Sequence, residues 1–148
     1  CMKLKTVLKL LRWWPPYLGA GVKVERFSKD LSEIDVSLKL TRFNKNYVGT
    51  QFGGSMFSMV DPFYMLIFIH LLGREYIVWD KAGSIDFTKP GRTKLYARFK
   101  VEEQELEKIK LNVQKDGKYI FEKEVLIKDT DGNIIASVIN TLYERKKN

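Results

Sequence analysis

The feature that most constrains the fold is an apolar run over residues 56–72, which continues for about 17 positions. A helix that is apolar on all sides needs other structure around it. The run is shorter than the roughly 20 apolar residues that cross a bilayer, and it contains Asp61, Pro62 and His70. We therefore expect a buried core helix that ends at Gly73, and no membrane span.

Strand patterns surround this run. Between residues 34 and 40 apolar and polar side chains alternate, which is typical of a half-buried strand. Residues 22–27 are expected to pair with it as a hairpin around residues 28–30. Further strands are predicted at residues 76–87, 95–101, 119–128 and 134–143, with turns at 89–92 and 129–132. This order predicts an α+β fold in which an antiparallel sheet of about five or six strands surrounds one helix.

Residues 102–115 fit two patterns. Leu106, Ile109 and Val113 have the spacing of a helix, whereas Leu111 together with Ile109 and Val113 alternates as in a strand. The segment begins with glutamates and ends with lysines, which matches the charge preference of a helix dipole. We therefore favour a helix.

Residues 1–14 have apolar side chains at helical spacing, and Pro15 and Pro16 are expected to end the segment. An amphipathic helix of this kind either lies on a membrane surface or docks on its own domain or a partner subunit. Ordinary surface helices share the pattern, so we favour docking. The segment lacks the long apolar region and the cleavage site that a signal peptide has.

The length of 148 residues fits one domain over residues 1–148. The 26 Lys and Arg against 18 Asp and Glu give a net charge of +8, which favours anionic partners such as nucleic acid, anionic lipid or coenzyme A. Tyr96, Arg98 and Phe99 mix aromatic and basic side chains as a nucleic-acid-binding sheet does. Strand alternation explains them equally well, and we expect no nucleic-acid partner.

Cys1 is the single cysteine, and it cannot form a disulfide within the chain. One cysteine and one histidine are also too few for a zinc site, which needs about four such ligands. We therefore expect no bound metal and a location in the reducing cytoplasm.

The most informative motif is NYVGTQFGGSMFSMVD at residues 46–61. Gly53 and Gly54 stand at the predicted start of the core helix, where backbone amides are free and the dipole favours negative charge. Such an arrangement is typical of an oxyanion hole. Asp61 follows inside the apolar run, where a carboxylate is costly unless it is bonded or used in chemistry. A tight turn and a bonded core carboxylate are the alternative interpretations.

The spacing of these residues points to a dimer. Seven residues separate Gly54 from Asp61, so on a continuous helix they share one face and lie about 10 Å apart along the axis. One subunit then cannot bring both to the same carbonyl group. Two such helices lying antiparallel across a two-fold axis would form two composite sites.

The motif resembles that of hot-dog-fold thioesterases of the phenylacetyl-CoA thioesterase type. The similarity rests on Asn46 and Gly49, on the Phe52-Gly53-Gly54 triplet, and on the carboxylate of Asp61. The stretches at residues 14–21 and 76–81 resemble a branch of that superfamily described as a domain of unknown function. The similarity extends over nearly the whole chain.

The resemblance implies a hot-dog fold, a homodimer or dimer of dimers, and hydrolysis of an acyl-CoA or a similar acyl thioester. It implies that Asp61 is the general base or nucleophile, that the Gly53 and Gly54 amides polarise the thioester carbonyl, and that Asn46 orients substrate or water. Phe52 stands where many such thioesterases carry histidine. The alternative is therefore a protein that binds or senses acyl ligands without turnover.

Further residues are expected to contact the substrate, with coenzyme A present only as part of it and no separate cofactor. Gln51, Phe52 and Ser55 flank the glycines, and basic side chains near the pocket suit the phosphates of coenzyme A. Solvated surface cations are the alternative interpretation of the basic residues. The basic candidates are Lys81, Lys89, Arg92 and Lys94.

Other chemistries lack their motifs. Residues 53–57 do not form a Gly-x-Ser-x-Gly elbow, and the chain has no phosphate-binding loop or dinucleotide fingerprint. On a continuous helix His70 would lie opposite Asp61, which leaves no base for a serine triad. By the family resemblance a hot-dog hydratase would have histidine five residues after the aspartate, where this chain has Leu66.

Overall fold

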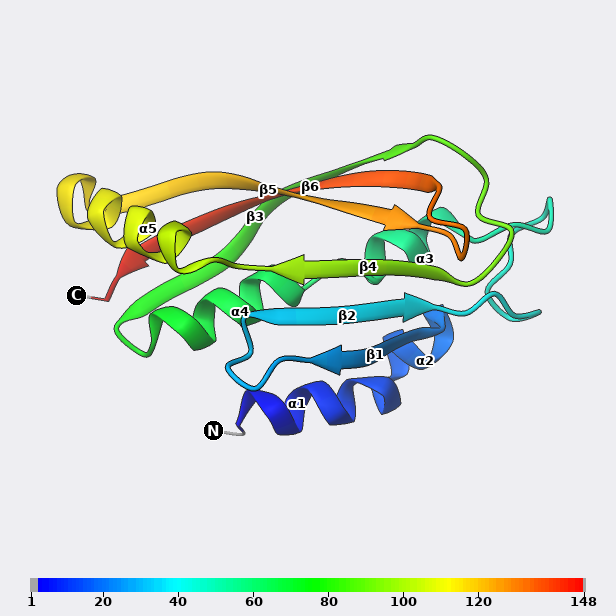
Figure 1. The fold of residues 1–148 in the computed structure, drawn as a ribbon, viewed down its shortest axis with the longest axis horizontal. Helices are drawn as coiled ribbons and strands as arrows, with labels where there is room; N and C mark the ends of the chain where they lie inside the picture. The colour runs from blue at the N-terminus through cyan, green and yellow to red at the C-terminus, as the bar shows by residue number, and fades with distance from the viewer. Residues whose placement is uncertain (1–2, 148) are drawn as a thin grey trace.

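A computed structural model of the protein describes residues 3–147 (Figure 1). Cys1, on which the disulfide and zinc arguments depend, lies outside the described residues. In chain order the elements are α1 (Leu4–Leu10), the 3-10 helix η1 (Leu11–Trp13), α2 (Pro15–Ala20), β1 (Val22–Phe27), β2 (Glu33–Leu38), α3 (Gly53–Ser58), α4 (Phe63–Leu72), β3 (Tyr76–Phe87), β4 (Leu95–Lys100), α5 (Glu103–Asp116), β5 (Lys118–Lys128) and β6 (Ile134–Lys146).

The strands form one six-stranded antiparallel sheet in the order β1-β2-β4-β5-β6-β3. The longest pairings join β6 to β5 and β3, whereas β4 and β5 pair only at two positions. The predicted hairpin of β1 and β2 is present. The sequence-based prediction of an α+β fold with an antiparallel sheet around helical structure is confirmed.

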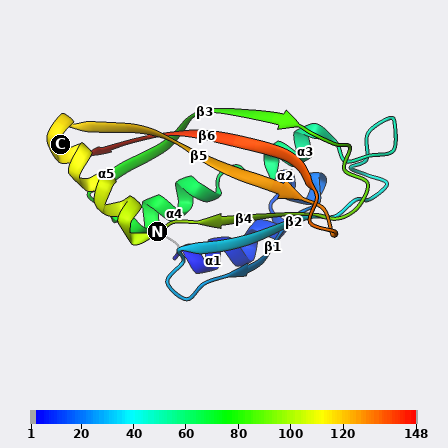
Figure 2. The same cartoon turned by 45° about the horizontal axis from the view of Figure 1, so that its top comes forward.

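Helices α3 and α4 pack on the inner face of the sheet (Figure 2). Phe63, Ile67 and Phe68 of α4 are fully buried, and Phe63 lies 5.1 Å, centroid to centroid, from the ring of Phe99 on β4. By length and composition the stretch Gly53–Leu72 is long and apolar enough to cross a membrane, and half of it is buried inside the fold. The core helix of a folded domain has the same properties, and α4 has that position here.

The predicted long core helix over residues 56–72 is present as α3 and α4, but it is not continuous. α3 ends at Ser58 and α4 begins at Phe63, with turns between them. Pro62 has no N–H group to continue the helical hydrogen bonds. The hydroxyl of Tyr17, on α2, donates a hydrogen bond to the backbone carbonyl oxygen of Asp61. The angular positions expected for Asp61 and His70 on an unbroken helix therefore do not apply.

The predicted N-terminal helix is present as α1, and a second short helix follows it. Pro15 and Pro16 do end the first helical segment, but they begin α2, because proline fits the first positions of a helix, where no N–H acceptor is needed. Tyr17 of α2 is buried against Phe63, at 6.1 Å between ring centroids. Leu8 of α1 is buried in the core, so α1 docks on its own domain.

The helix interpretation of residues 102–115 is confirmed by α5. Glu102 and Glu105 form a capping box at its start, in which each carboxylate accepts a hydrogen bond from the other residue's backbone N–H. Ile109 and Val113 are buried, and Gly117 ends the helix with a positive φ of 75°.

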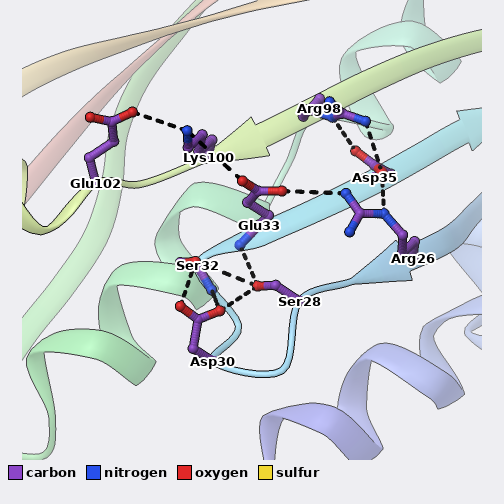
Figure 3. A network of polar contacts seen from close by, with 9 residues as sticks. All are labelled: Arg26, Ser28, Asp30, Ser32, Glu33, Asp35, Arg98, Lys100 and Glu102. Carbon is purple, nitrogen blue, oxygen red and sulfur yellow. Dashed lines mark hydrogen bonds and ion pairs between the residues drawn. The ribbon is translucent and has the colours of Figure 1, made fainter.

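The outer face of β1, β2 and β4 carries a network of ion pairs (Figure 3). Asp35 accepts from Arg26 at 2.8 Å and from Arg98 at 2.7 Å, and Lys100 lies 4.0 Å from Glu33. Exposed ion pairs contribute little to stability. Arg98 is one of the residues for which a nucleic-acid contact was considered. Here it pairs with Asp35 of its own sheet.

Candidate functional site

The loop before α3 is held by side chains of the motif itself. The Asn46 side-chain amide donates to the Thr50 hydroxyl at 2.9 Å, and its oxygen accepts from the Thr50 backbone N–H at 2.9 Å. Gln51 is buried, and its amide nitrogen donates to the carbonyl oxygens of Leu38 (3.2 Å) and Thr93 (3.1 Å). Asn46 therefore holds the loop together, whereas Gln51 attaches it to the end of β2, and the Gln51 Oε1 atom has no hydrogen-bond partner.

A cavity of about 400 Å³ opens beside this loop. It brings together four of the predicted site residues, Asn46, Gln51, Gly53 and Lys89. Lys89 among the lining residues offers a positive charge to an anionic ligand.

The two glycines have a packing role that the sequence did not reveal. A Cβ atom on Gly54 would lie 2.5 Å from the ring of Phe52, and one on Gly53 would lie 2.9 Å from the ring of Phe87. The absence of side chains thus lets both aromatic rings approach the start of α3. Gly54, Phe52 and Ser55 line a second hollow of about 500 Å³.

Asp61 lies at the break between α3 and α4. The sequence predicted that Asp61 is buried within an apolar helix. In the single chain this is wrong, because Asp61 lies in a turn and is exposed to solvent. Its backbone is anchored by Tyr17, as described above. Asp61 lines neither of the two hollows beside the glycines, so within one chain the carboxylate stands apart from the start of α3.

The neighbour of Asp61 is a residue that sequence reasoning did not select. Asp80 on β3 is partly buried, and burial followed by the negative charge of Asp61 raises the pKa of Asp80 to about 6. The amide of Asn140 on β6 acts in the opposite direction. Asp80 Oδ1 and Asn140 Oδ1 are both buried without a hydrogen-bond partner.

A second missed carboxyl, Glu144, lies four positions after Asn140 on β6. Glu144 is fully buried, neither of its side-chain oxygens has a partner, and burial raises its pKa to about 8. Asn140, Leu142 and Glu144 alternate with more exposed residues and so face the core. The period-2 pattern of this strand was visible, but ending the predicted strand at residue 143 left Glu144 out.

The predicted phosphate-binding residues are spread over the surface. Lys81 is exposed at a β-bulge between Asp80 and Ala82, and Lys89 lines the cavity beside Gly53. Arg92 lines a different hollow, together with Lys94. Within residues 3–147 these basic side chains therefore lie at separate positions.

Strand β3 occupies one end of the sheet. Over residues 3–147 only β6 pairs with it, so its second edge is open along the strand that carries Asp80. An open edge of this length is a surface suited to pairing with another strand.

Solved structures share the fold. PA5026 from Pseudomonas aeruginosa, a protein of unknown function and probable thioesterase, superposes with a TM-score of 0.83 at 13% identity, covering 99% of this chain and 97% of that one. OLEI01261 from Chlorobaculum tepidum, of unknown function, gives 0.76 at 15% identity, covering 97% and 95%. The thioesterase HI1161 from Haemophilus influenzae gives 0.69 at 13% identity, covering 99% and 92%.

At these identities the likeness shows the fold alone, which is the hot-dog fold of thioesterases. No curated protein matches the chain. The family described as domain of unknown function DUF4442 matches residues 5–143. Since that match spans nearly the whole sequence, the protein belongs to the DUF4442 family.

Proposed function

We propose that the protein hydrolyses an acyl thioester, such as an acyl-CoA, at a site formed by two copies of the chain. The observation that carries the proposal is Asp61, an exposed carboxylate on an anchored backbone at the helix break. A carboxylate held in this way suits a general base that activates water. The hot-dog fold shared with thioesterases supports the same chemistry by analogy.

The first backbone amides of α3 supply the second requirement. The first residues of a helix have N–H groups without helical acceptors, and here they belong to Gly53 and Gly54. Glycines leave these amides uncovered by side chains of their own. In the proposed site they donate to the thioester oxygen as it gains negative charge.

The two parts belong to different subunits in this proposal. Asp61 lies at the far end of α3 from its own glycines, and β3 has an open edge. Antiparallel pairing of two β3 edges about a two-fold axis makes one interface and two equivalent sites. Asp61 of one copy then faces the Gly53-Gly54 end of the other.

The reaction in this site has two steps. Asp61 accepts a proton from water as the water oxygen attacks the carbonyl carbon, and the amides hold the resulting oxyanion. The carbon–sulfur bond then breaks, and the proton on Asp61 passes to the leaving thiolate. The products are a carboxylic acid and a thiol. Lys89, in the cavity beside Gly53, offers a charge for an anionic part of the substrate.

Phe52 favours a second candidate function, binding of an acyl ligand without turnover. Its ring lies over Gly54 and is 56% exposed, so an aromatic group occupies the place beside the amides. An apolar ring adds contact area for an acyl chain but no hydrogen-bond donor.

Thiol release from a panel of short, aromatic and long acyl-CoA esters separates the two functions. Hydrolysis by the wild type that is lost in Asp61→Asn supports the enzyme. Glu122→Gln, an exposed change on β5 and away from the proposed β3 interface, is the control and should keep the activity. Ligand binding without release of thiol from any ester supports the binding protein. Light scattering at micromolar concentration tests the assembly, and a strict monomer contradicts the two-copy site.

A further inference from the structure

The helical segment of α1, η1 and α2 has an outer side that its docking leaves uncovered. Leu8 and Tyr17 of this segment face the core. Four large apolar side chains of the same segment are exposed instead, namely Leu10, Trp13, Trp14 and Leu18. Trp13 is 61% exposed and Leu18 is 56% exposed. Single exposed apolar residues are ordinary, but a group of them on one short segment is typical of a contact surface.

Basic side chains accompany this apolar group. Residues 1–24 contain no aspartate or glutamate. The exposed cations of the segment are Lys3, Lys5, Lys9 and Arg12. The Arg12 guanidinium lies 4.6 Å from the centre of the Trp13 ring, so a positive charge stands over an exposed aromatic side chain. We call these exposed apolar and basic side chains of residues 3–18 the N-terminal surface.

The N-terminal surface differs from the outer face of the sheet in how its charges are paired. On the sheet, Arg98 pairs with Asp35 at 2.7 Å, and Lys94 pairs with Glu25 at 2.7 Å. Within residues 3–147, no ion pair involves a cation of the N-terminal surface. The positive charge of the sheet is therefore offset inside the fold, whereas that of the N-terminal surface favours an external anion.

A groove of about 660 Å³ continues this surface between α1 and α4. Apolar side chains from both helices line it, namely Leu4, Val7, Leu66 and Ile69. Among the described residues that line the groove, the charged ones are Lys3, Lys5 and Arg74. The groove thus combines apolar walls with positive charge, as the exposed segment does.

The N-terminal surface lies away from the edge that the proposed dimer uses. The helical segment contacts β1, which stands at one end of the strand order, and β3 stands at the other end. Figure 2 shows α1 beside β1, with β3 on the opposite side of the molecule. A dimer that pairs two β3 edges therefore leaves this surface open to another partner.

We propose that the N-terminal surface binds an anionic membrane surface. A bilayer with anionic lipids offers negative headgroups above an apolar layer, which matches the lysines and the exposed apolar side chains together. Tryptophan prefers the boundary between headgroups and acyl chains. The contact is peripheral, because Leu8 holds α1 on its own domain and nothing needs to cross the bilayer.

The hollow beside Gly54 lies next to this surface. Gly19 and Ala20 of α2 line that hollow together with Phe43 and Phe52. Long acyl chains partition into membranes, because each buried methylene group adds to the transfer free energy. A membrane-bound chain would therefore hold this hollow close to where acyl lipids gather. The membrane contact itself does not depend on the proposed hydrolysis.

Cosedimentation with lipid vesicles tests the charge contribution. The wild type should bind phosphatidylcholine vesicles that contain about 30% phosphatidylglycerol, bind pure phosphatidylcholine much more weakly, and dissociate in 1 M NaCl, where the Debye length is about 3 Å. Each lysine beside an anionic bilayer contributes about fivefold in affinity, so Lys5→Gln/Lys9→Gln should bind about 25-fold more weakly. Lys108→Gln/Lys115→Gln removes the same charge from exposed positions on α5 and should bind as the wild type does.

The apolar contribution is tested with a second matched pair. Trp13→Ala should weaken vesicle binding, whereas Leu111→Ala, also strongly exposed but on α5, should leave it unchanged. Lack of binding to anionic vesicles by the wild type overturns the proposal, and so does an equal loss in the two lysine pairs, which would reflect net charge alone. If vesicles are not bound and Trp13→Ala lowers the mass measured by light scattering, the surface joins copies of the chain instead. These assays contain no thioester, so they are independent of the test for hydrolysis.

Discussion

Glu144 gives the most direct test of the physical reasoning. Its side chain faces the core from β6, is 0% exposed, and both of its oxygens lack partners. A carboxylate ion in such a place would lose its hydration without compensation. The group therefore stays protonated, and its pKa rises from 4.5 to about 8.

The sign of the effect on stability follows from proton linkage. Between pH 4.5 and about 8 the unfolded chain has lost the Glu144 proton and the folded chain retains it. The free energy of unfolding then decreases by about 1.4 kcal/mol per pH unit, or about 5 kcal/mol over the window. The stability contribution is complete below pH 4.5 and is lost as pH rises through the folded-state pKa.

Glu144→Gln removes this titration, because an amide is neutral at every pH. The difference in unfolding free energy between Glu144→Gln and wild type should grow by about 3 kcal/mol from pH 4.5 to pH 7. Urea denaturation at several pH values and constant protein concentration measures it. Glu122→Gln, exposed on β5, is the matched control and should follow the wild type. Equal pH slopes for wild type and Glu144→Gln would refute the reasoning.

Two further substitutions test the site. Tyr17→Phe keeps the ring but removes the donor to the Asp61 carbonyl, and we expect a loss of about 1 kcal/mol in urea denaturation together with a lower kcat. Phe52→His replaces the ring over Gly54 with a side chain that can donate a hydrogen bond. If the proposed hydrolysis is correct, thiol release should rise, by up to about a hundredfold, and no increase would exclude residue 52 as the missing donor.

The sheet could be predicted from the sequence because its signals are local. Alternation in each strand, the turn at residues 129–132 and the charge gradient of α5 are all set by near neighbours. Pro62 indicates a bend before Phe63, but not that turns occupy residues 59–62 and that α3 ends at Ser58. The apolar run continues through the turn because both α3 and α4 pack against the same sheet, so hydrophobicity did not mark the end of either helix.

The candidate site could be predicted only in part, for a related reason. The motif indicated Asn46, Gln51 and Gly53, which share a cavity with Lys89, because these residues are close in sequence or near one turn. Asp80 belongs to a strand whose alternation is interrupted by a bulge, so its inward orientation depends on pairing with β6, about 60 residues away in the chain. Local patterns contain no information on that register.

The buried polar side chains on β3 and β6, those of Asp80, Asn140 and Glu144, connect the stability of the fold with the proposed function. Apolar residues of similar size at Asp80, Asn140 and Glu144 would remove four unpartnered oxygens from the core and should stabilise the fold. Folding alone therefore gives no reason for their presence. Asp80 lies on β3, the strand whose second edge is open, and Asn140 and Glu144 lie on the neighbouring strand β6. Departures from local packing rules are expected at functional sites, and this departure therefore supports the site that we propose beside β3.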